Sequence, residues 1–395
     1  MKIRRFTLTR IGGVAVIAFL AITLADAAEL SATRTATFVV ATADSSDASK
    51  ATADFVGDGQ GDQEEINKAL QALPEAGGSV LLMEGNYDIR RVPDKLGGVL
   101  IERSNVTLAG QGDSTRLTLA EEQNINVIRI LGSGIHHVVV RDLVVDANRA
   151  QNPNGKAPPD LEHKHFEFCG IKAYASDPRV GGAEFAHDIT IRNCDVRNAY
   201  SLGIMMEGAN MRCLDNNLGD CNSDCVEILG GPGIIRGCQV EVTGRVHVAI
   251  GSDRANDILM QGNIVRVREG GNLDIGFRSW SNSDRHIITG NIVKVEKGGK
   301  CTLAMDVRGR GSVVSANNVT TWNADQPTRL KITAGNAVVT GNVLENVVIE
   351  VNDETGGDQP IIVEQNVLIN SSVEHKAGNL AGSPARPAPK GGSDK

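Results

Sequence analysis

The chain repeats one short pattern, seen most clearly in Gln261-Gly262-Asn263-Ile264-Val265-Arg266-Val267 and again in Thr289-Gly290-Asn291-Ile292-Val293-Lys294-Val295. In each copy an Asn precedes two aliphatic residues within a strand-like stretch. The pattern recurs with Asn or Cys at the key position, at Cys194, Asn217, Cys238, Asn263, Asn291, Asn318, Asn342 and Asn366. These positions are 23, 21, 25, 28, 27, 24 and 24 residues apart, so the chain is built from units of similar length.

A repeat of this length predicts a solenoid. Leucine-rich repeats need a Leu-x-x-Leu-x-Leu frame, which is absent here, and propeller blades are longer. One turn of a three-sheet β-helix fits the spacing, with the variation absorbed in loops. We therefore predict an all-β fold, a right-handed single-stranded parallel β-helix in which the Asn and Cys positions stack as an internal ladder. The low aromatic content of 3% agrees with a core of stacked aliphatic residues.

Residues 1–27 have the features of a signal peptide: basic residues, an apolar stretch over 11–24, and Ala25-Asp26-Ala27, which fits the cleavage rule. The apolar stretch is short for a membrane span. We expect a secreted or periplasmic protein with no membrane span after cleavage. Cleavage would change the formal net charge from -8 to -11, because four positive charges and one negative charge are removed. Such an acidic chain is not expected to bind nucleic acid.

The remaining sequence divides into three parts. Residues 28–53 are expected to be a flexible lead-in, 54–375 the β-helix domain, and 376–395 a disordered tail. A helix is predicted from Gln63 to Leu73, with Asp62 as its N-cap, and it would cover the open edge of the first coil. The seven cysteines are an odd number and are interpreted as buried free thiols.

Four segments at the start of this domain resemble the corresponding part of pectate-lyase-like β-helix proteins. They are Asp-Phe-Val-Gly-Asp-Gly-Gln-Gly-Asp at 54–62, Gly-Gly-Ser-Val-Leu-Leu-Met-Glu-Gly-Asn-Tyr at 77–87, Val-Thr-Leu-Ala-Gly-Gln-Gly at 106–112 and Val-Asp-Ala-Asn-Arg at 145–149. The resemblance covers about 55–375 and implies the pectin-lyase-like fold. That superfamily includes polysaccharide lyases, hydrolases and epimerases, as well as non-catalytic binding solenoids.

A second strand follows each ladder position, and alternation predicts which of its residues face outward. The outward set is strongly charged. We predict catalytic roles for Glu207, Asp224, Glu227, His247 and Arg278. We predict substrate-binding roles for Lys172, Asp274, Trp280, Asp306, Arg308 and Lys331. The alternative interpretation is a solvated face whose opposite charges pair between coils.

Three observations favour chemistry on this face. Arg278 and Arg308 are expected in one column on successive coils, where like charges are unfavourable unless Asp306 and Asp274 compensate them or an anion such as a carboxylated sugar does. His247 is an outward imidazole that could act as an acid or base. Glu207 and Glu227 are expected about 8 Å apart, from one coil and two strand positions, which fits an inverting glycosidase pair.

The same face has an incomplete likeness to polygalacturonases. Asn222-Ser223-Asp224-Cys225 resembles their Asp-Asp-Cys element with Ser223 in place of the first Asp. Val246-His247-Val248-Ala249-Ile250-Gly251-Ser252 is similar to their His element. Arg278-Ser279-Trp280 resembles Arg-x-Lys with Trp280 in place of Lys. The earlier Asp of those enzymes has no counterpart near Leu202. With two carboxylates and the Lys missing, unchanged polygalacturonase chemistry is not expected.

We therefore expect an exported carbohydrate-active enzyme, a monomer, that cleaves an acidic polysaccharide by β-elimination or hydrolysis. A polysaccharide epimerase and a non-catalytic β-helix that binds glycans or acts at the cell surface are the alternatives. No cofactor is required by the sequence. A bound Ca²⁺ is an option, with Asp224, Glu227 and Glu207 as its candidate ligands.

Overall fold

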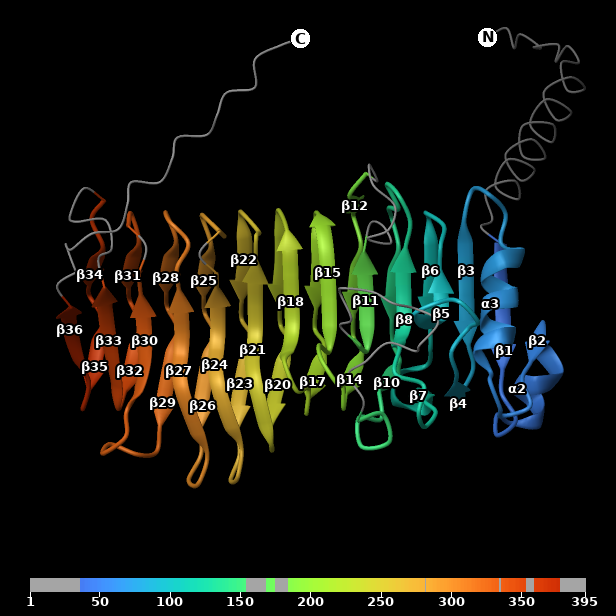
Figure 1. Cartoon of the computed structure of the whole chain (residues 1–395), viewed down its shortest axis with the longest axis horizontal. Helices are drawn as coiled ribbons and strands as arrows, with labels where there is room; N and C mark the ends of the chain where they lie inside the picture. The colour runs from blue at the N-terminus through green and yellow to red at the C-terminus, as the bar shows by residue number, and fades with distance from the viewer. Residues whose placement is uncertain are drawn as a thin grey trace, which may run out of the picture.

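The chain forms a long solenoid of parallel strands (Figure 1). The computed structural model describes residues 36–153, 168–174, 184–280, 282–333, 335–352 and 359–376. In these residues the strands form three sheets of 13, 11 and 12 strands. Neighbours in each sheet come from successive coils, because the chain visits the three sheets in turn. The predicted all-β parallel β-helix is confirmed.

The segment expected as a flexible lead-in is partly structured. Strand β1 (Ala36–Ala41) pairs in parallel with β3 (Gly78–Leu82) and β2 (Phe55–Val56). Helix α2 (Asp47–Thr52) follows β1. The prediction of a flexible lead-in for 28–53 is therefore wrong from residue 36 onward. The polar composition of this segment does not indicate that its backbone pairs with a strand 42 residues further along. The signal-peptide prediction for 1–27 lies outside the described residues.

Helix α3 (Gln63–Ala72) lies at the N-terminal end of the solenoid (Figure 1). Its apolar stripe packs Ile66, Ala69 and Leu70 into the main core, and Leu73 follows directly after the helix. This packing covers apolar surface that an open first coil would leave in water. The predicted N-terminal capping helix is confirmed.

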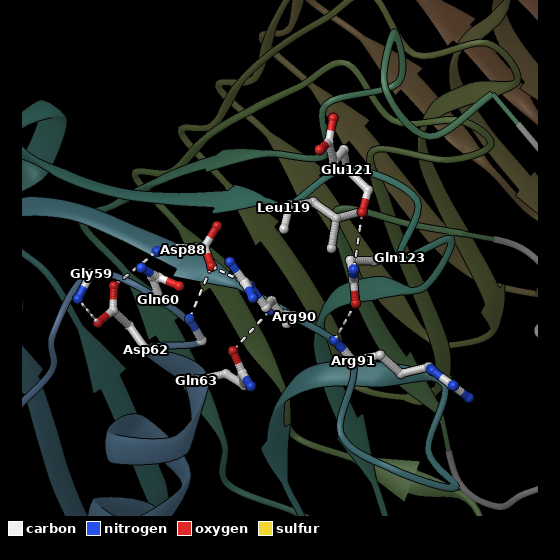
Figure 2. Close-up of polar contacts among 12 residues, drawn as sticks. Gly59, Gln60, Asp62, Gln63, Asp88, Arg90, Arg91, Leu119, Glu121 and Gln123 are labelled. Carbon is white, nitrogen blue, oxygen red and sulfur yellow. Dashed lines mark hydrogen bonds and ion pairs between the residues drawn. The ribbon is translucent and has the colours of Figure 1, made fainter.

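Asp62, the residue before α3, has a different role from the predicted one (Figure 2). Its carboxylate makes no capping hydrogen bond to the helix. It accepts hydrogen bonds from the backbone N–H of Gly59 at 3.0 Å and of Asp88 at 2.9 Å, and from the Thr42 hydroxyl at 2.9 Å. Burial raises the pKa of Asp62. Asp62 therefore joins the first coil to strand β4 (Gly85–Ile89).

An internal ladder of side chains connects the coils, as predicted. Asn263 Nδ2 donates to Asn291 Oδ1 at 3.0 Å, and Asn291 Nδ2 donates to Asn317 Oδ1 at 2.9 Å. The same amide-to-amide bond continues from Asn317 to Asn342 and from Asn342 to Asn366. Buried amides need such partners, because an unpaired buried polar group costs about 1–3 kcal/mol.

Two predicted ladder positions are wrong by one residue. Asn216 and Asn317 are the buried ladder residues, whereas Asn217 and Asn318 are exposed and begin the next strands. Both errors fall in an Asn-Asn pair, where the repeat does not say which Asn points inward. The ladder positions are Cys194, Asn216, Cys238, Asn263, Asn291, Asn317, Asn342 and Asn366.

The two ends of the solenoid differ. At the C-terminal end, Val367, Leu368, Ile369 and Val373 are 36–55% exposed. Strand β36 (Ser372–Lys376) is the last described element, so the predicted tail lies outside the described residues except for Lys376.

All seven cysteines are free and six are buried, as expected. Among the described residues, no helix has the length and apolar character to cross a membrane.

Candidate functional site on the twelve-stranded sheet

The predicted site residues come together on the outer face of the 12-stranded sheet. Its central strands are β18 (Asp224–Gly230), β21 (Arg245–Asp253), β24 (Asn272–Ser279), β27 (Lys300–Val307) and β30 (Thr328–Ile332). The register places one residue from each coil in a single column, in the order Lys172, Met205, Glu227, Gly251, Arg278, Asp306 and Lys331. Five of the predicted site residues therefore share this column.

Arg278 binds two carboxylates that lie two coils earlier. Its Nη2 donates to Asp224 Oδ2 at 2.7 Å and to Glu227 Oε1 at 2.6 Å. We call these three residues the Arg278 cluster. Their side chains are 10%, 3% and 11% exposed for Arg278, Asp224 and Glu227. Because the groups are largely removed from water, each charge depends on the others for its stability.

A glycine makes the long reach of Arg278 possible. Gly251 occupies the column position between Glu227 and Arg278. A Cβ at this position would lie 3.0 Å from Asp224 Oδ2 and 3.4 Å from Arg278 Nη2. Any other residue would therefore crowd the ion pair, and Gly251 leaves the space through which the guanidinium crosses one coil.

Arg308 lies in a different column from Arg278, which corrects the predicted stacking of the two arginines. Arg278 pairs across the sheet with Asp306, and Arg308 is two residues further along. The guanidinium carbons of Arg308 and Arg278 lie 4.3 Å and 5.1 Å from the ring centroid of Trp280. Arg308 also pairs with Asp306, a fully buried carboxylate, at 2.7 Å. Protein carboxylates thus compensate both arginines: Asp306 pairs with Arg308, as one alternative expected, whereas Asp224 and Glu227, and not Asp274, pair with Arg278.

Glu207 lies where alternation predicts it. On β15 (Ile204–Ala209), Met205 pairs with Glu227 and Glu207 pairs with Leu229, so the offset of one coil and two positions is confirmed. Only Glu227 of this pair belongs to the Arg278 cluster, where its carboxylate accepts a hydrogen bond from Arg278 Nη2 at 2.6 Å.

His247 and Asp274 form a second site on the same face. His247 Nδ1 lies 3.0 Å from Asp274 Oδ2, and Arg245 Nη2 donates to the same oxygen at 3.3 Å. The side chains of His247 and Asp274 are 45% and 30% exposed, and that of Arg245 is 70% exposed. We call His247 and Asp274 the histidine dyad. A carboxylate at one ring nitrogen fixes the imidazole and leaves the other nitrogen available to exchange a proton.

The described residues contain no group of three or more His, Cys, Asp or Glu side chains arranged to hold a metal ion. Two of the candidate calcium ligands, Asp224 and Glu227, are bound to one guanidinium nitrogen. Arg278 therefore occupies the position between these carboxylates that a cation would take. The side chains described here supply no other calcium site on this face.

The remaining predicted binding residues lie at the two ends of the column. Lys172 is buried, and its Nζ lies 5.1 Å from the centroid of the Tyr174 ring. Lys331 is half-buried between Asp306 and Glu350 in the column. Their predicted contact with substrate stays a prediction.

A buried serine and histidine pair lies beneath the same sheet. Ser252 Oγ is 2.6 Å from His286 Nε2, and both residues are fully buried. Burial lowers the pKa of His286 to about 4, so the imidazole is neutral at pH 7. A hydroxyl next to a neutral imidazole is the arrangement of an activated nucleophile. Because neither group is exposed, the pair is structural in this conformation.

Sequence reasoning missed Arg245, Trp322 and Arg329. Arg245 and Arg329 lie on outward positions of β21 and β30 that alternation would have included had the strands been extended toward their N-terminal ends. Trp322 lies in the connection between β29 (Asn318–Thr321) and β30 and is 46% exposed. Trp322 could have been singled out from the sequence because tryptophan is rare in this chain, which has two.

Solved structures with the same fold were found by structural comparison. The N-terminal fragment of bacteriophage Phi29 gene product 12 matches with a TM-score of 0.58 and 15% identity, over 91% of this chain and 66% of that chain. A GH136 lacto-N-biosidase from Eubacterium ramulus matches with a TM-score of 0.55 and 10% identity, over 89% and 70%. DFA-IIIase from Arthrobacter chlorophenolicus A6 in complex with GF2 matches with a TM-score of 0.50 and 14% identity, over 86% and 88%.

At these identities the similarity shows the fold. The chain is a parallel β-helix protein of the pectate-lyase-like architecture, which confirms the resemblance found in its first coils. No protein-family model matches the chain, and the comparison with curated proteins finds no match.

Proposed function

We propose that the protein is an exported enzyme that acts on an acidic polysaccharide along the outer face of the 12-stranded sheet. The proposed reaction is β-elimination, which begins with removal of the proton next to a uronate carboxylate. The observation that carries this proposal is the half-exposed histidine dyad, in which the Asp274 carboxylate lies 3.0 Å from His247 Nδ1. Export is proposed from the composition of residues 1–27 and a monomer from the sequence.

The dyad suits proton abstraction. With Nδ1–H donated to Asp274, Nε2 of His247 carries a lone pair that accepts the C5 proton of the uronate. The electrons of the C5–H bond form the C4–C5 double bond, the C4–O bond breaks, and the departing oxygen takes a proton from water. The hydroxide left behind takes the abstracted proton from His247 and restores the neutral imidazole. The adjacent Arg245, which is 70% exposed, supplies positive charge for the substrate carboxylate.

One consideration favours elimination over hydrolysis: Asp224 and Glu227 are both held by the Arg278 guanidinium, whereas His247 is accessible as a base. Epimerisation shares the first proton abstraction but also needs a proton donor on the opposite face of the sugar. The lacto-N-biosidase and DFA-IIIase named above carry the names of carbohydrate-active enzymes on this fold, which supports a carbohydrate substrate.

A non-catalytic glycan-binding protein is the second candidate. The observation that favours it is the mutual neutralisation of Arg278, Asp224 and Glu227, together with that of Arg308 and Asp306. Charges paired in this way stabilise a rigid face and need no reaction to explain them.

The decisive experiment incubates the mature protein with a panel of polyuronates, with and without EDTA. Absorbance of the unsaturated product and the number of reducing ends are followed together. We expect new absorbance with His247 intact, and a loss of about 10²- to 10⁴-fold in turnover for His247→Asn, the usual contribution of a general base. Reducing ends without absorbance would instead indicate hydrolysis. Binding without either signal would indicate the non-catalytic candidate.

The control is another histidine with a similar environment. His187 Nδ1 lies 2.8 Å from Asp188, and their side chains are 40% and 28% exposed, close to the values for the dyad. His187→Asn should leave turnover unchanged. Equal losses in both variants would show that the effect is one of folding, and equal retention would remove His247 from the proposed reaction.

A further inference from the structure

A hollow of about 390 Å³ lies beside the histidine dyad, on the same side of the solenoid. Its floor is formed by the first residues of β24, β27 and β30, including Asn272, Lys300 and Arg329. Its wall is the connection from Trp322 to Pro327. We call it the Trp322 hollow. None of the residues assigned above to catalysis or to the Arg278 cluster lines it.

Trp322 presents an aromatic surface to the hollow. The side chain is held in place, because its indole N–H donates to the backbone carbonyl of Gly299 at 3.0 Å. Even so, 46% of the residue remains exposed. A fixed aromatic ring that stays accessible beside polar groups is a surface on which the C–H face of a sugar ring can pack. Amide side chains of Asn272, Asn323 and Gln326 also line the hollow and can bond hydroxyl groups.

The charge of the hollow is opposite to that of the whole protein. Lys300 and Arg329 line it, and none of its lining residues is acidic, although the chain has a formal net charge of -8. Arg329 Nη1 pairs with Glu350, and its side chain is 43% exposed. Lys300 is exposed and Arg329 shares Glu350 with Lys376, so positive charge exceeds negative charge around the hollow and favours an anionic ligand.

The hollow lies next to the histidine dyad along the same strands. Asn272 at its edge pairs across the sheet with Arg245 on one side and Lys300 on the other, and it precedes Asp274 by two residues. Successive coils are separated by about 4.8 Å, so Arg329 lies roughly 10 Å along the solenoid from the coil of Asp274. A saccharide chain bound at the dyad and directed toward the C-terminal coils would pass over Trp322.

From these observations we propose that the Trp322 hollow is a subsite for one carboxylated sugar unit of the bound polysaccharide. Trp322 contacts the face of the ring, and Lys300 and Arg329 bind its carboxylate. The inference rests on the proposed function in that it takes the same polysaccharide as ligand. It requires binding alone and no particular reaction.

The test measures binding of oligogalacturonate and oligomannuronate to protein carrying His247→Asn, so that turnover does not consume the ligand. Lys300→Gln combined with Arg329→Gln removes the charge and keeps most of each stem, and Lys376 still pairs with Glu350 at 2.8 Å. We expect the Kd to rise at least about tenfold, with a weaker salt dependence. Trp322→Ala should weaken binding of the same oligomers.

The controls separate charge from fold. Lys294→Gln removes an exposed cation from β26 (Ile292–Val295), on the 11-stranded sheet, and should leave the Kd unchanged. Carboxyl-reduced oligomers should bind weakly to all variants. The subsite is overturned if wild type binds no anionic oligomer, if the reduced oligomers bind as well, or if the double variant keeps its Kd within twofold. Turnover that depends on His247 would then still support the proposed reaction, and subsite binding without turnover would leave only the subsite.

Discussion

The Arg278 cluster and the histidine dyad lie on one sheet face but use their charges differently. In the cluster the three side chains are 3–11% exposed, and one guanidinium nitrogen serves two carboxylates. In the dyad the side chains are 30–45% exposed, and His247 contacts Asp274 through Nδ1 and not through Nε2. Charged residues at outward positions of the same strand can therefore differ in role, since Arg278 and Asp274 both lie on β24.

The difference follows from what lies beside each group. Gly251 leaves room for Arg278 to reach over a neighbouring coil to Asp224 and Glu227, and the ring of Trp280 lies 5.1 Å from its guanidinium. The dyad is closer to the start of its strands, next to the exposed Arg245 and the Trp322 hollow. Whether a charged side chain can contact a substrate therefore depends on how far the neighbouring side chains bury it.

The largest expected effect comes from a substitution that breaks the Arg278 cluster. Arg278→Met removes the guanidinium that contacts both buried carboxylates and should destabilise the fold by about 3–5 kcal/mol, because Asp224 and Glu227 both lose this partner. Urea unfolding at pH 7 measures this. Adding Asp224→Asn and Glu227→Gln should recover much of the loss. Normal stability with abolished turnover would instead support the predicted role of Arg278 in catalysis.

The second largest expected effect is a loss of stability in acid that comes from His286 and is separate from the chemistry of the dyad. Burial lowers the pKa of His286 to about 4, so between about pH 6.5 and pH 4 the unfolded chain binds a proton that the folded protein does not. Stability from this group is present above pH 6.5 and is lost as the pH falls. We expect a loss of about 2 kcal/mol between pH 7 and pH 4.5. His286→Asn should lack this component in paired unfolding curves, and identical pH slopes would contradict the assignment.

The smallest expected effect concerns the exposed arginine. Arg245→Met should change the free energy of unfolding by less than about 1 kcal/mol, because an exposed ion pair contributes little. The change should appear instead as a higher KM for a polyuronate. A stability loss comparable to that of Arg278→Met would show that the two sites do not differ as described.

Much of the fold could be predicted from sequence, because a β-helix repeats its pattern in every coil. Alternation identified the outward face, and the offset between Glu207 and Glu227 was right. The pairing of Arg278 with Arg308 was wrong because the register between coils depends on loops of different lengths, which the sequence does not fix. Ion pairs that cross a coil, such as Arg278 with Asp224, need three-dimensional information. Trp322 was missed because it lies outside the repeat.

The exposed apolar side chains of the last described coil have a consequence for how the solenoid unfolds. The N-terminal coil is covered by α3, whereas the last coil leaves Val367, Leu368, Ile369 and Val373 partly in water. Since each coil contacts mainly its neighbours, the molecule should fray from this end, one coil at a time. The contacts of the histidine dyad come from β21 and β24, several coils away. The terminal coils can therefore open and close while the dyad keeps its geometry.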